Sequence, residues 1–180
     1  MPDAQSRVSV CTTAVRLIPM DCKGILLRID RPNELESLLG ARVGEFATTI
    51  GEVAAQTAAL LERSPRDPPW IGYVTVDCET NQTIGVCGFK NAPASGKVEI
   101  AYFTFPVFEN HGFATAMAAE MVAIARSSPN IHEVIAHTLP QPNASTHVLR
   151  KNGFRNAGAV IDLEDGPVWR WELDLLGSGV

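Results

Sequence analysis

The sequence predicts one α+β domain with three layers, in which a mixed, mostly antiparallel central sheet carries helices on both faces. Its 180 residues are 46% hydrophobic and only 19% charged, which is typical of a globular chain long enough to bury a sizeable core. Paired segments with strand periodicity lie among segments with helical periodicity, and turn residues separate them at short intervals. We therefore expect a flexible tail over residues 1–9 and a single domain over residues 10–176.

The first half of the chain predicts a strand, several helices and a hairpin. Residues 13–18 form a short strand pattern, and residues 20–50 carry a loosely helical pattern broken by proline and glycine. Residues 51–63 are rich in Ala and Leu and end at prolines, as a helix does. Residues 70–76 and 83–89 alternate around a polar turn, which predicts two antiparallel strands.

The second half of the chain contains a central strand, described below. After it, the sequence predicts two more helices and three more strands. Residues 113–126 place apolar side chains on one stripe of a helix, and residues 133–139 follow as a strand. Asn143 can cap a helix that ends at Lys151. Residues 154–162 and 168–173 complete the domain as a hairpin.

The central strand is expected over residues 98–105, with both faces largely apolar, as in a strand covered on both sides. Glu99 is the exception, because it shares its face with Ala101, Phe103 and Phe105. Desolvation favours the neutral, protonated form of such a carboxylate, so Glu99 is a candidate general base near neutral pH. The alternatives are that Glu99 pairs with a buried Arg or lies at a frayed strand end.

Charge and hydropathy limit the classes of partner. Fifteen basic and twenty acidic residues give a net charge of −5, which disfavours nucleic acid and suits a cationic or amine substrate. No apolar stretch reaches the ~18 residues of a membrane span, and the first twenty residues contain no apolar block of a signal peptide. We expect a cytoplasmic protein that does not associate with membranes.

Cysteine and histidine spacing does not predict a metal site. We expect the four cysteines to be reduced and mostly buried: Cys11, Cys22, Cys78 and Cys87. Three histidines also lack metal-ligand spacing and are expected at the surface or behind a site: His132, His137 and His147.

Two short motifs can bind a ligand or perform chemistry. A loop with small residues leads from the central strand into the next helix, Glu109-Asn110-His111-Gly112-Phe113-Ala114-Thr115. Such a helix start presents free N–H groups and the positive end of the helix dipole, which together bind phosphate, although a Gly at a helix start is also a common turn. The second motif is Asn143-Ala144-Ser145 with a later Gly153-Phe154, which a helix cap and a helix stop would also explain.

Together these motifs resemble the GNAT superfamily of acetyl-CoA-dependent N-acetyltransferases, in particular its RimJ/RimL-like branch. The Gln/Arg-x-x-Gly-x-Gly/Ala loop of the family is met at Gly112 and Ala114, but Glu109 stands at its first position. The resemblance implies an acetyl-CoA N-acyltransferase-like fold whose two central parallel strands splay apart. It also implies that pantetheine pairs with backbone of Phe103, Thr104 and Phe105.

The resemblance further implies that the pyrophosphate rests on the segment Asn110, His111, Gly112, Phe113, Ala114 and Thr115. In this segment His111 is the only nearby cation, so backbone amides and Thr115 would carry the binding. Asn143 and Ser145 would lie near the thioester. Relatives often place a Tyr proton donor where this chain has Leu149, so Ser145 or water would protonate the leaving thiolate.

The implied function is transfer of the acetyl group of acetyl-CoA to a primary amine, of a small molecule or a protein N-terminus, with Glu99 as base and without a metal. The expected partner is then the amine substrate. A homodimer, formed by two copies of the chain, is a further expectation. The competing hypothesis is a degenerate, non-catalytic module that binds CoA or another protein. Glu109 and Leu149 favour that alternative, whereas Glu99 and Ser145 oppose it.

Overall fold

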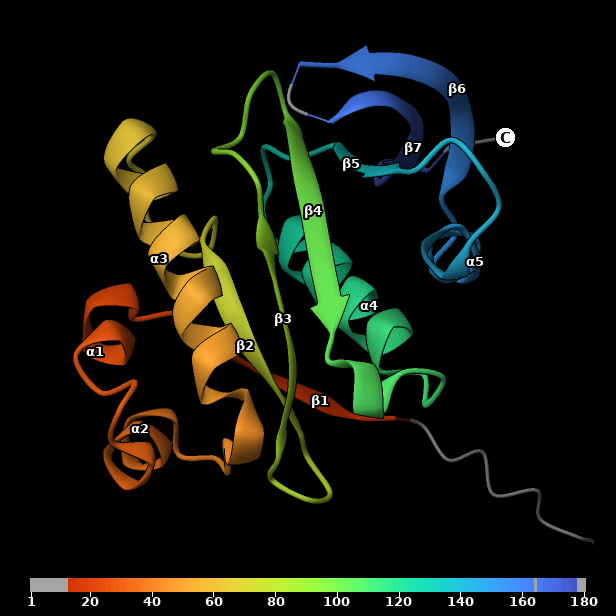
Figure 1. The fold of residues 1–180 in the computed structure, drawn as a ribbon. Helices are drawn as coiled ribbons and strands as arrows, with labels where there is room; N and C mark the ends of the chain where they lie inside the picture. Colours follow the sequence, from red (N-terminus) through yellow and green to blue (C-terminus); the bar gives the residue numbers. More distant parts are fainter. Residues whose placement is uncertain (1–12, 164, 178–180) are drawn as a thin grey trace, which may run out of the picture.

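A single seven-stranded sheet runs through the part of the chain that the computed structural model describes, residues 13–163 and 165–177 (Figure 1). The strand order is β1-β2-β3-β4-β5-β7-β6. The strands are β1 (Val15–Pro19), β2 (Gly72–Asp77), β3 (Thr83–Phe89), β4 (Lys97–Thr104), β5 (Glu133–Thr138), β6 (Arg155–Asp162) and β7 (Gly166–Asp174). All neighbours in this sheet pair antiparallel except β4 and β5, which are parallel.

Helices cover both faces of the sheet, so the predicted fold class is confirmed. They are α1 (Cys22–Leu26), α2 (Pro32–Leu39), α3 (Ala47–Arg63), α4 (Phe113–Arg126) and α5 (Ala144–Lys151), with 3₁₀ turns η1 (Gly44–Phe46) and η2 (Pro106–Phe108). The first three helices pack one apolar cluster against β2 and β3, including Leu35 and Ile50. The helices α4 and α5 pack a second cluster on the other face, including Met117, Leu149 and Trp171.

The element order agrees with the sequence, and α4 has the predicted ends. The loosely helical region becomes α1, α2 and η1, and α2 ends at Gly40, whose φ of 58° is left-handed. The prediction that a helix starts at Gly51 is wrong, because α3 already begins at Ala47. Gly51 lies inside α3, where a Cβ would collide with the side chain of Ile29, so glycine permits close packing there.

The sheet opens between β4 and β5, as the resemblance implied. Their parallel pairing covers Lys97 with Glu133, Val98 with Val134 and Glu99 with Ile135, and no further pair is formed between these strands. The second half of β4 therefore has a free edge toward β5. This free edge positions the candidate site.

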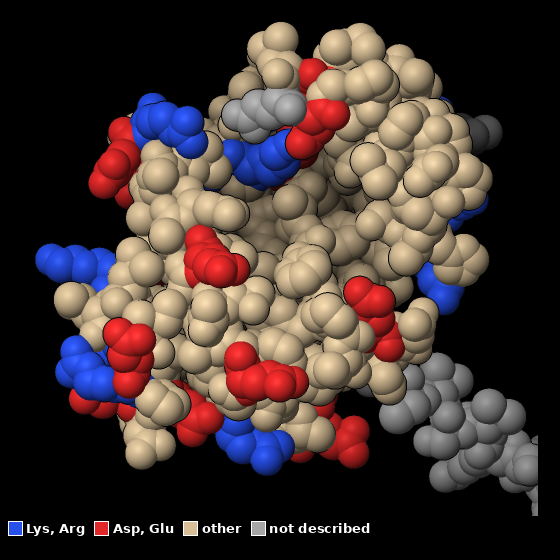
Figure 2. All heavy atoms as spheres, viewed as in Figure 1, with Lys and Arg blue, Asp and Glu red and all other residues tan. Residues whose placement is uncertain are grey.

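One face of β4 is also less covered than the sequence suggested. Ala101 is exposed and Phe103 is 46% exposed, so the prediction that both faces are covered is wrong over this stretch. In Figure 1, α3 lies over β2, and β3 lies between α3 and β4. Figure 2 shows the resulting hollow, with charged side chains on its upper rim and uncharged residues over its floor.

Two further expectations concern cysteines and membranes. Cys22 and Cys87 are free and buried, and burial raises the pKa of the Cys87 thiol to about 12. Cys78 is free but exposed, contrary to the expectation for it, because it lies in the turn after β2. Cys11 and the expected tail over residues 1–9 lie outside the described residues. Each helix in the described chain is too short or too polar to cross a bilayer.

Candidate active site

A groove of about 460 Å³ lies along the free edge of β4, between the start of α4 and one side of α5. We call it the β4 groove. It brings together most of the residues singled out from the sequence: Phe103, Thr104, Asn110, Gly112, Phe113, Ala114, Thr115 and Ser145. Residues from three separate parts of the chain therefore line one cavity.

The start of α4 offers free backbone N–H groups to this groove. Gly112 is the N-cap with φ +84°, and no side chain caps the helix. The first intrahelical bond runs from the Ala116 N–H to the Gly112 carbonyl, 3.0 Å, so the N–H groups of the first turn lack helical acceptors. Thr13 Oγ1 holds the loop by donating to the His111 carbonyl, 3.1 Å. An uncapped helix start in a groove can hold an anion such as a phosphate.

Three predicted residues do not reach the groove. His111 is exposed, and its Nδ1 bonds to the carbonyl of Glu109, 2.7 Å, in its own loop. Asn143 caps α5, because its Oδ1 accepts the Thr146 N–H at 3.0 Å. Phe105 is fully buried and its ring stacks on another phenylalanine, with 4.3 Å between the centroids.

The backbone of Phe105 was expected to pair with a ligand, but its polar groups are already paired within the protein. Its N–H donates to the Ile84 carbonyl, 2.9 Å, and its carbonyl accepts from the Phe108 N–H, 2.8 Å. Because backbone polar groups alternate sides along a strand, those of Phe103 also face β3. The groups that face the free edge belong to Tyr102 and Thr104. Of the implied set, only Thr104 therefore presents its backbone groups at the free edge, and Tyr102 does so beside it.

Lys151 is a groove cation that the sequence reading missed. It lies at the end of α5 and lines the groove with Ser145 and Val148. The side chain of Asn152 ties this helix end to the start of α4 by donating to the Thr115 carbonyl, 3.2 Å. A spacing of three residues places Ser145, Val148 and Lys151 on one helix face, and this spacing could have identified the lysine.

Glu99 faces a polar cavity in the splay between β4 and β5, and its side chain is 16% exposed. Its Oε1 accepts from Lys90 Nζ at 3.2 Å and bonds to His137 Nδ1 at 2.9 Å. The expectation of a carboxylate with only apolar neighbours is therefore wrong, because the ends of β3 and β5 each contribute a polar partner. Within the described residues, its Oε2 makes no hydrogen bond or ion pair.

Lys90 is held firmly in its charged form. Burial acts to lower its pKa, but the charge and hydrogen bond of Glu99 outweigh burial, and Asp165 adds to the effect, so the pKa is raised above its ordinary value. The distance from Lys90 Nζ to Asp165 Oδ2 is 3.7 Å. Lys90 is thus neutralised by two carboxylates rather than free to bind an anion.

Tyr102 stands where three cavities meet. It lines the β4 groove, the polar cavity around Glu99, and an apolar cavity under α3. Its hydroxyl donates to the Ser145 carbonyl at 3.4 Å, and burial raises the pKa of the phenol well above its usual range. Ser145 lines both the groove and the polar cavity, and Leu149, at the family's Tyr position, is fully buried. A molecule that donates a chemical group and a second molecule that accepts it, bound in adjoining cavities, could therefore meet beside Tyr102 and Ser145.

A helix start with free backbone N–H groups beside two splayed parallel strands is the arrangement that the resemblance to acetyltransferases implied, and the comparisons agree. Residues 29–155, more than half of the chain, match the family model of the acetyltransferase (GNAT) domain. The chain belongs to this family, which implies acyltransferase activity. No curated protein matches the sequence.

Solved structures share the fold at low identity. A GNAT-family acetyltransferase from Bacillus anthracis has a TM-score of 0.62 at 12% identity, covering 92% of this chain and 98% of its own. RimL, a ribosomal L7/L12 alpha-N-protein acetyltransferase in complex with CoA, gives 0.62 at 15% identity, with coverage of 91% and 95%. The aminoglycoside acetyltransferase AAC(6')-Ib in complex with CoA gives 0.63 at 17% identity, with coverage of 89% and 95%.

Proposed function

We propose that the protein is an N-acetyltransferase of the RimJ/RimL-like branch that transfers the acetyl group of acetyl-CoA to a primary amine. One observation carries this proposal. The β4 groove joins the polar cavity of Glu99 at Tyr102 and Ser145, so a phosphate-binding end and a proton-accepting end are connected. The net charge of −5 supports an amine partner, and the free thiols of Cys22 and Cys87 support a cytoplasmic location.

The residues of the groove fit CoA. The uncapped N–H groups of the first turn of α4 and the Lys151 ammonium suit the phosphates. Thr104 Oγ1 is buried and has no partner among the described residues, so it is a hydrogen-bonding group left for a ligand such as an amide of pantetheine. Acetyl-CoA would supply an activated acetyl thioester. The N–H of Tyr102 or Thr104 on the free edge can donate to its carbonyl oxygen.

Glu99 is the proposed acceptor of the proton that the amine must lose. Lys90 and His137 hold Oε1, which orients the carboxylate and leaves Oε2 free to accept a proton from the ammonium, directly or through a water. The amine nitrogen then forms the new N–C bond as the C–S bond breaks. The nitrogen must lose a second proton as the amide forms, and Ser145, whose hydroxyl makes no hydrogen bond within the described chain, can accept that proton as it gives its own to the departing sulfur.

The alternative is a degenerate module that binds CoA without turnover. It is favoured by Glu109, which lines the groove as a carboxylate where phosphate would bind, and by Leu149, which cannot donate a proton. Thiol release from acetyl-CoA with a panel of primary amines separates the two. The proposed enzyme releases CoA only when an amine is present, whereas the module binds acetyl-CoA and releases none with any amine.

A further inference from the structure

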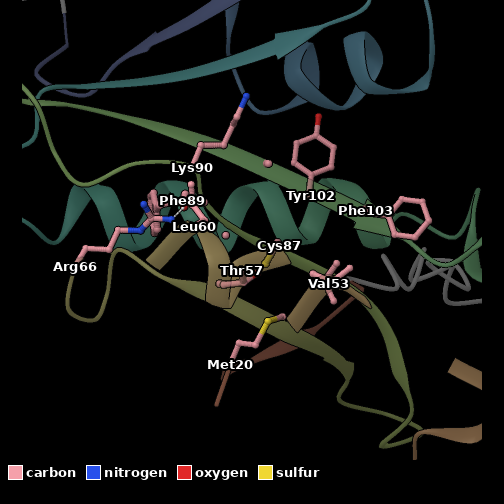
Figure 3. A pocket seen from close by; sticks show the side chains of 14 residues that line it. Met20, Val53, Thr57, Leu60, Arg66, Cys87, Phe89, Lys90, Tyr102 and Phe103 are labelled. Atoms are coloured by element: carbon pink, nitrogen blue, oxygen red, sulfur yellow. Dashed lines mark hydrogen bonds between the residues drawn. The ribbon is translucent and has the colours of Figure 1, made fainter. Parts of the chain in front are cut away.

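The apolar cavity under α3, which we call the acceptor cavity, has about 230 Å³ of space. Figure 3 shows it between α3 and the strands, with Arg66 and Phe89 at one end and Phe103 at the other. Val53, Thr57 and Leu60 of α3 form one wall. It shares Lys90, Ala101 and Tyr102 with the polar cavity, so its contents would lie next to Glu99.

Missing side chains create this space. Gly72 and Gly88 line the cavity on neighbouring strands, and a Cβ on Gly88 would lie 2.8 Å from the Gly72 Cα. A Cβ on Gly72 would contact Thr57 at 3.4 Å and the Met20 sulfur at 3.7 Å. The floor is therefore backbone, and the walls are mostly hydrocarbon. Such a cavity suits an apolar group.

Charge at the Arg66 end of the cavity is not neutralised. The charged residues that line the cavity are Lys90 and Arg66, and both are cations. Lys90 points away from Arg66 in Figure 3 and is paired with two carboxylates. Arg66 has no acidic partner within residues 13–163 and 165–177: its Nη2 donates to the Phe89 carbonyl at 3.2 Å. In the same part of the chain its Nε and Nη1 are buried without any partner.

Arg66 as a residue is half-buried, and desolvation lowers its pKa, in keeping with a guanidinium that has lost part of its hydration without gaining an anion. Buried charges are normally paired, because the unpaired ion loses its hydration and gains nothing. A guanidinium pairs best with a carboxylate, through two parallel hydrogen bonds. The unmet need at this end of the cavity is therefore an anion, and the best match is a carboxylate.

We propose that the acceptor is a small amine that carries both an apolar body and a carboxylate, with the carboxylate on Arg66 and the amine at Ala101 beside Glu99. This inference rests on the proposed N-acetyltransferase function and names its substrate class. The space is smaller than the roughly 300–1,000 Å³ of sites for drug-sized ligands, which disfavours large acceptors. A polyamine would bring a second ammonium against Arg66, in a cavity without an acidic side chain among its described lining residues.

Matched pairs of acceptors test the proposal, since the members of each pair differ only in the carboxylate. The pairs are leucine with 3-methylbutylamine, phenylalanine with 2-phenylethylamine, and 6-aminohexanoate with pentylamine, and spermidine is added as a polyamine. We expect kcat/KM for CoA release to be roughly 10- to 100-fold higher for the carboxylate member of at least one pair, the worth of a charged hydrogen bond. The proposal is overturned if kcat/KM of the carboxylate member is equal to or lower than that of its partner in all three pairs, or if spermidine is preferred. This test needs no variant of the protein.

The variant Arg66→Gln then tests whether the preference for the carboxylate member of a pair depends on Arg66. It should remove the preference within the pair, whereas Arg63→Gln, an exposed arginine just before it that does not line the cavity, should keep the preference. An equal loss for both members of the pair in Arg66→Gln shows a structural role only and overturns the assignment.

A second readout separates this inference from the proposed function. If no amine releases CoA, the proposed function fails, and binding of 6-aminohexanoate and leucine in the presence of CoA is measured by thermal shift. Stabilisation by either compound that is lost in Arg66→Gln and kept in Arg63→Gln upholds the carboxylate site. No stabilisation of the wild-type protein by either compound overturns it.

Discussion

Replacing Gly112 by alanine should weaken both the fold and acetyl-CoA binding, and a matched glycine separates the two effects. Gly112 has φ +84°, and its added Cβ would lie 3.2 Å from Thr13 Oγ1. Gly40 has φ +58° with open space around it, and it ends α2 without lining the β4 groove. The left-handed backbone costs an alanine about 1–2 kcal/mol at either position. A larger, β-branched residue such as valine would be strained further at Gly112.

The loss of stability should lower the Tm of both variants by about 2–8 °C, since 1 kcal/mol shifts a domain of this size by about 2–4 °C. At a concentration of 100 times Kd, acetyl-CoA should stabilise the wild-type protein and Gly40→Ala by about 2.7 kcal/mol. A tenfold weaker Kd in Gly112→Ala would reduce this to about 1.4 kcal/mol, so the ligand-induced rise in Tm should fall by about half. Thermal shift with and without acetyl-CoA measures all six values. If Gly112→Ala gains as much as Gly40→Ala from acetyl-CoA, the groove does not bind phosphate at α4.

Three further predictions concern the chemistry and the charge of the site. Glu99→Gln should lose about 10²- to 10⁴-fold in kcat while keeping its affinity for acetyl-CoA, and its activity should recover as the pH rises and the free amine forms unaided. Full activity at neutral pH, or an unfolded variant, would make Glu99 a structural carboxylate. Ser145→Ala should lower turnover with little change in Tm, and an unchanged rate would leave water as the proton donor. Lys151→Gln should weaken acetyl-CoA binding and Glu109→Gln should strengthen it, each by about 2- to 5-fold and less at high salt, because both side chains are exposed. Calorimetric titration at two salt concentrations checks the pair, and the same sign for both variants would place the phosphates elsewhere.

Local features of the sequence predicted the elements that begin and end with specific residues. The helix α4 has its predicted ends because Gly112 starts it and Ser127 ends it, each within a few residues of the chain. The cap of α5 at Asn143 was equally local. The start of α3 was mistaken because Gly51 lies inside the helix, where it permits close packing against Ile29 in the turn between α1 and α2, and the spacing of residues along the chain does not show this contact.

The parts of the site that depend on distant pairings could not be predicted in this way. The register of β4 on β5 pairs Glu99 with Ile135 and so places His137 within reach of the carboxylate, whereas Lys90 arrives from the end of β3. The backbone groups of β4 that face the splay are those that do not pair with β3. This pairing is not visible in the sequence of β4, so Tyr102 was overlooked. The acceptor cavity depends on the contact of Gly72 with Gly88 across two strands.

The most direct test of the proposed enzyme is the stoichiometry of acetyl transfer in one reaction. The purified protein is incubated with acetyl-CoA carrying a labelled acetyl group and with a reactive primary amine, and free CoA and labelled N-acetyl product are quantified together. We predict equal amounts of CoA and N-acetylated amine, both rising with time and both reduced at least 100-fold in Glu99→Gln. Acetyl-CoA binding without labelled product, or CoA release that does not depend on the amine, would contradict the account.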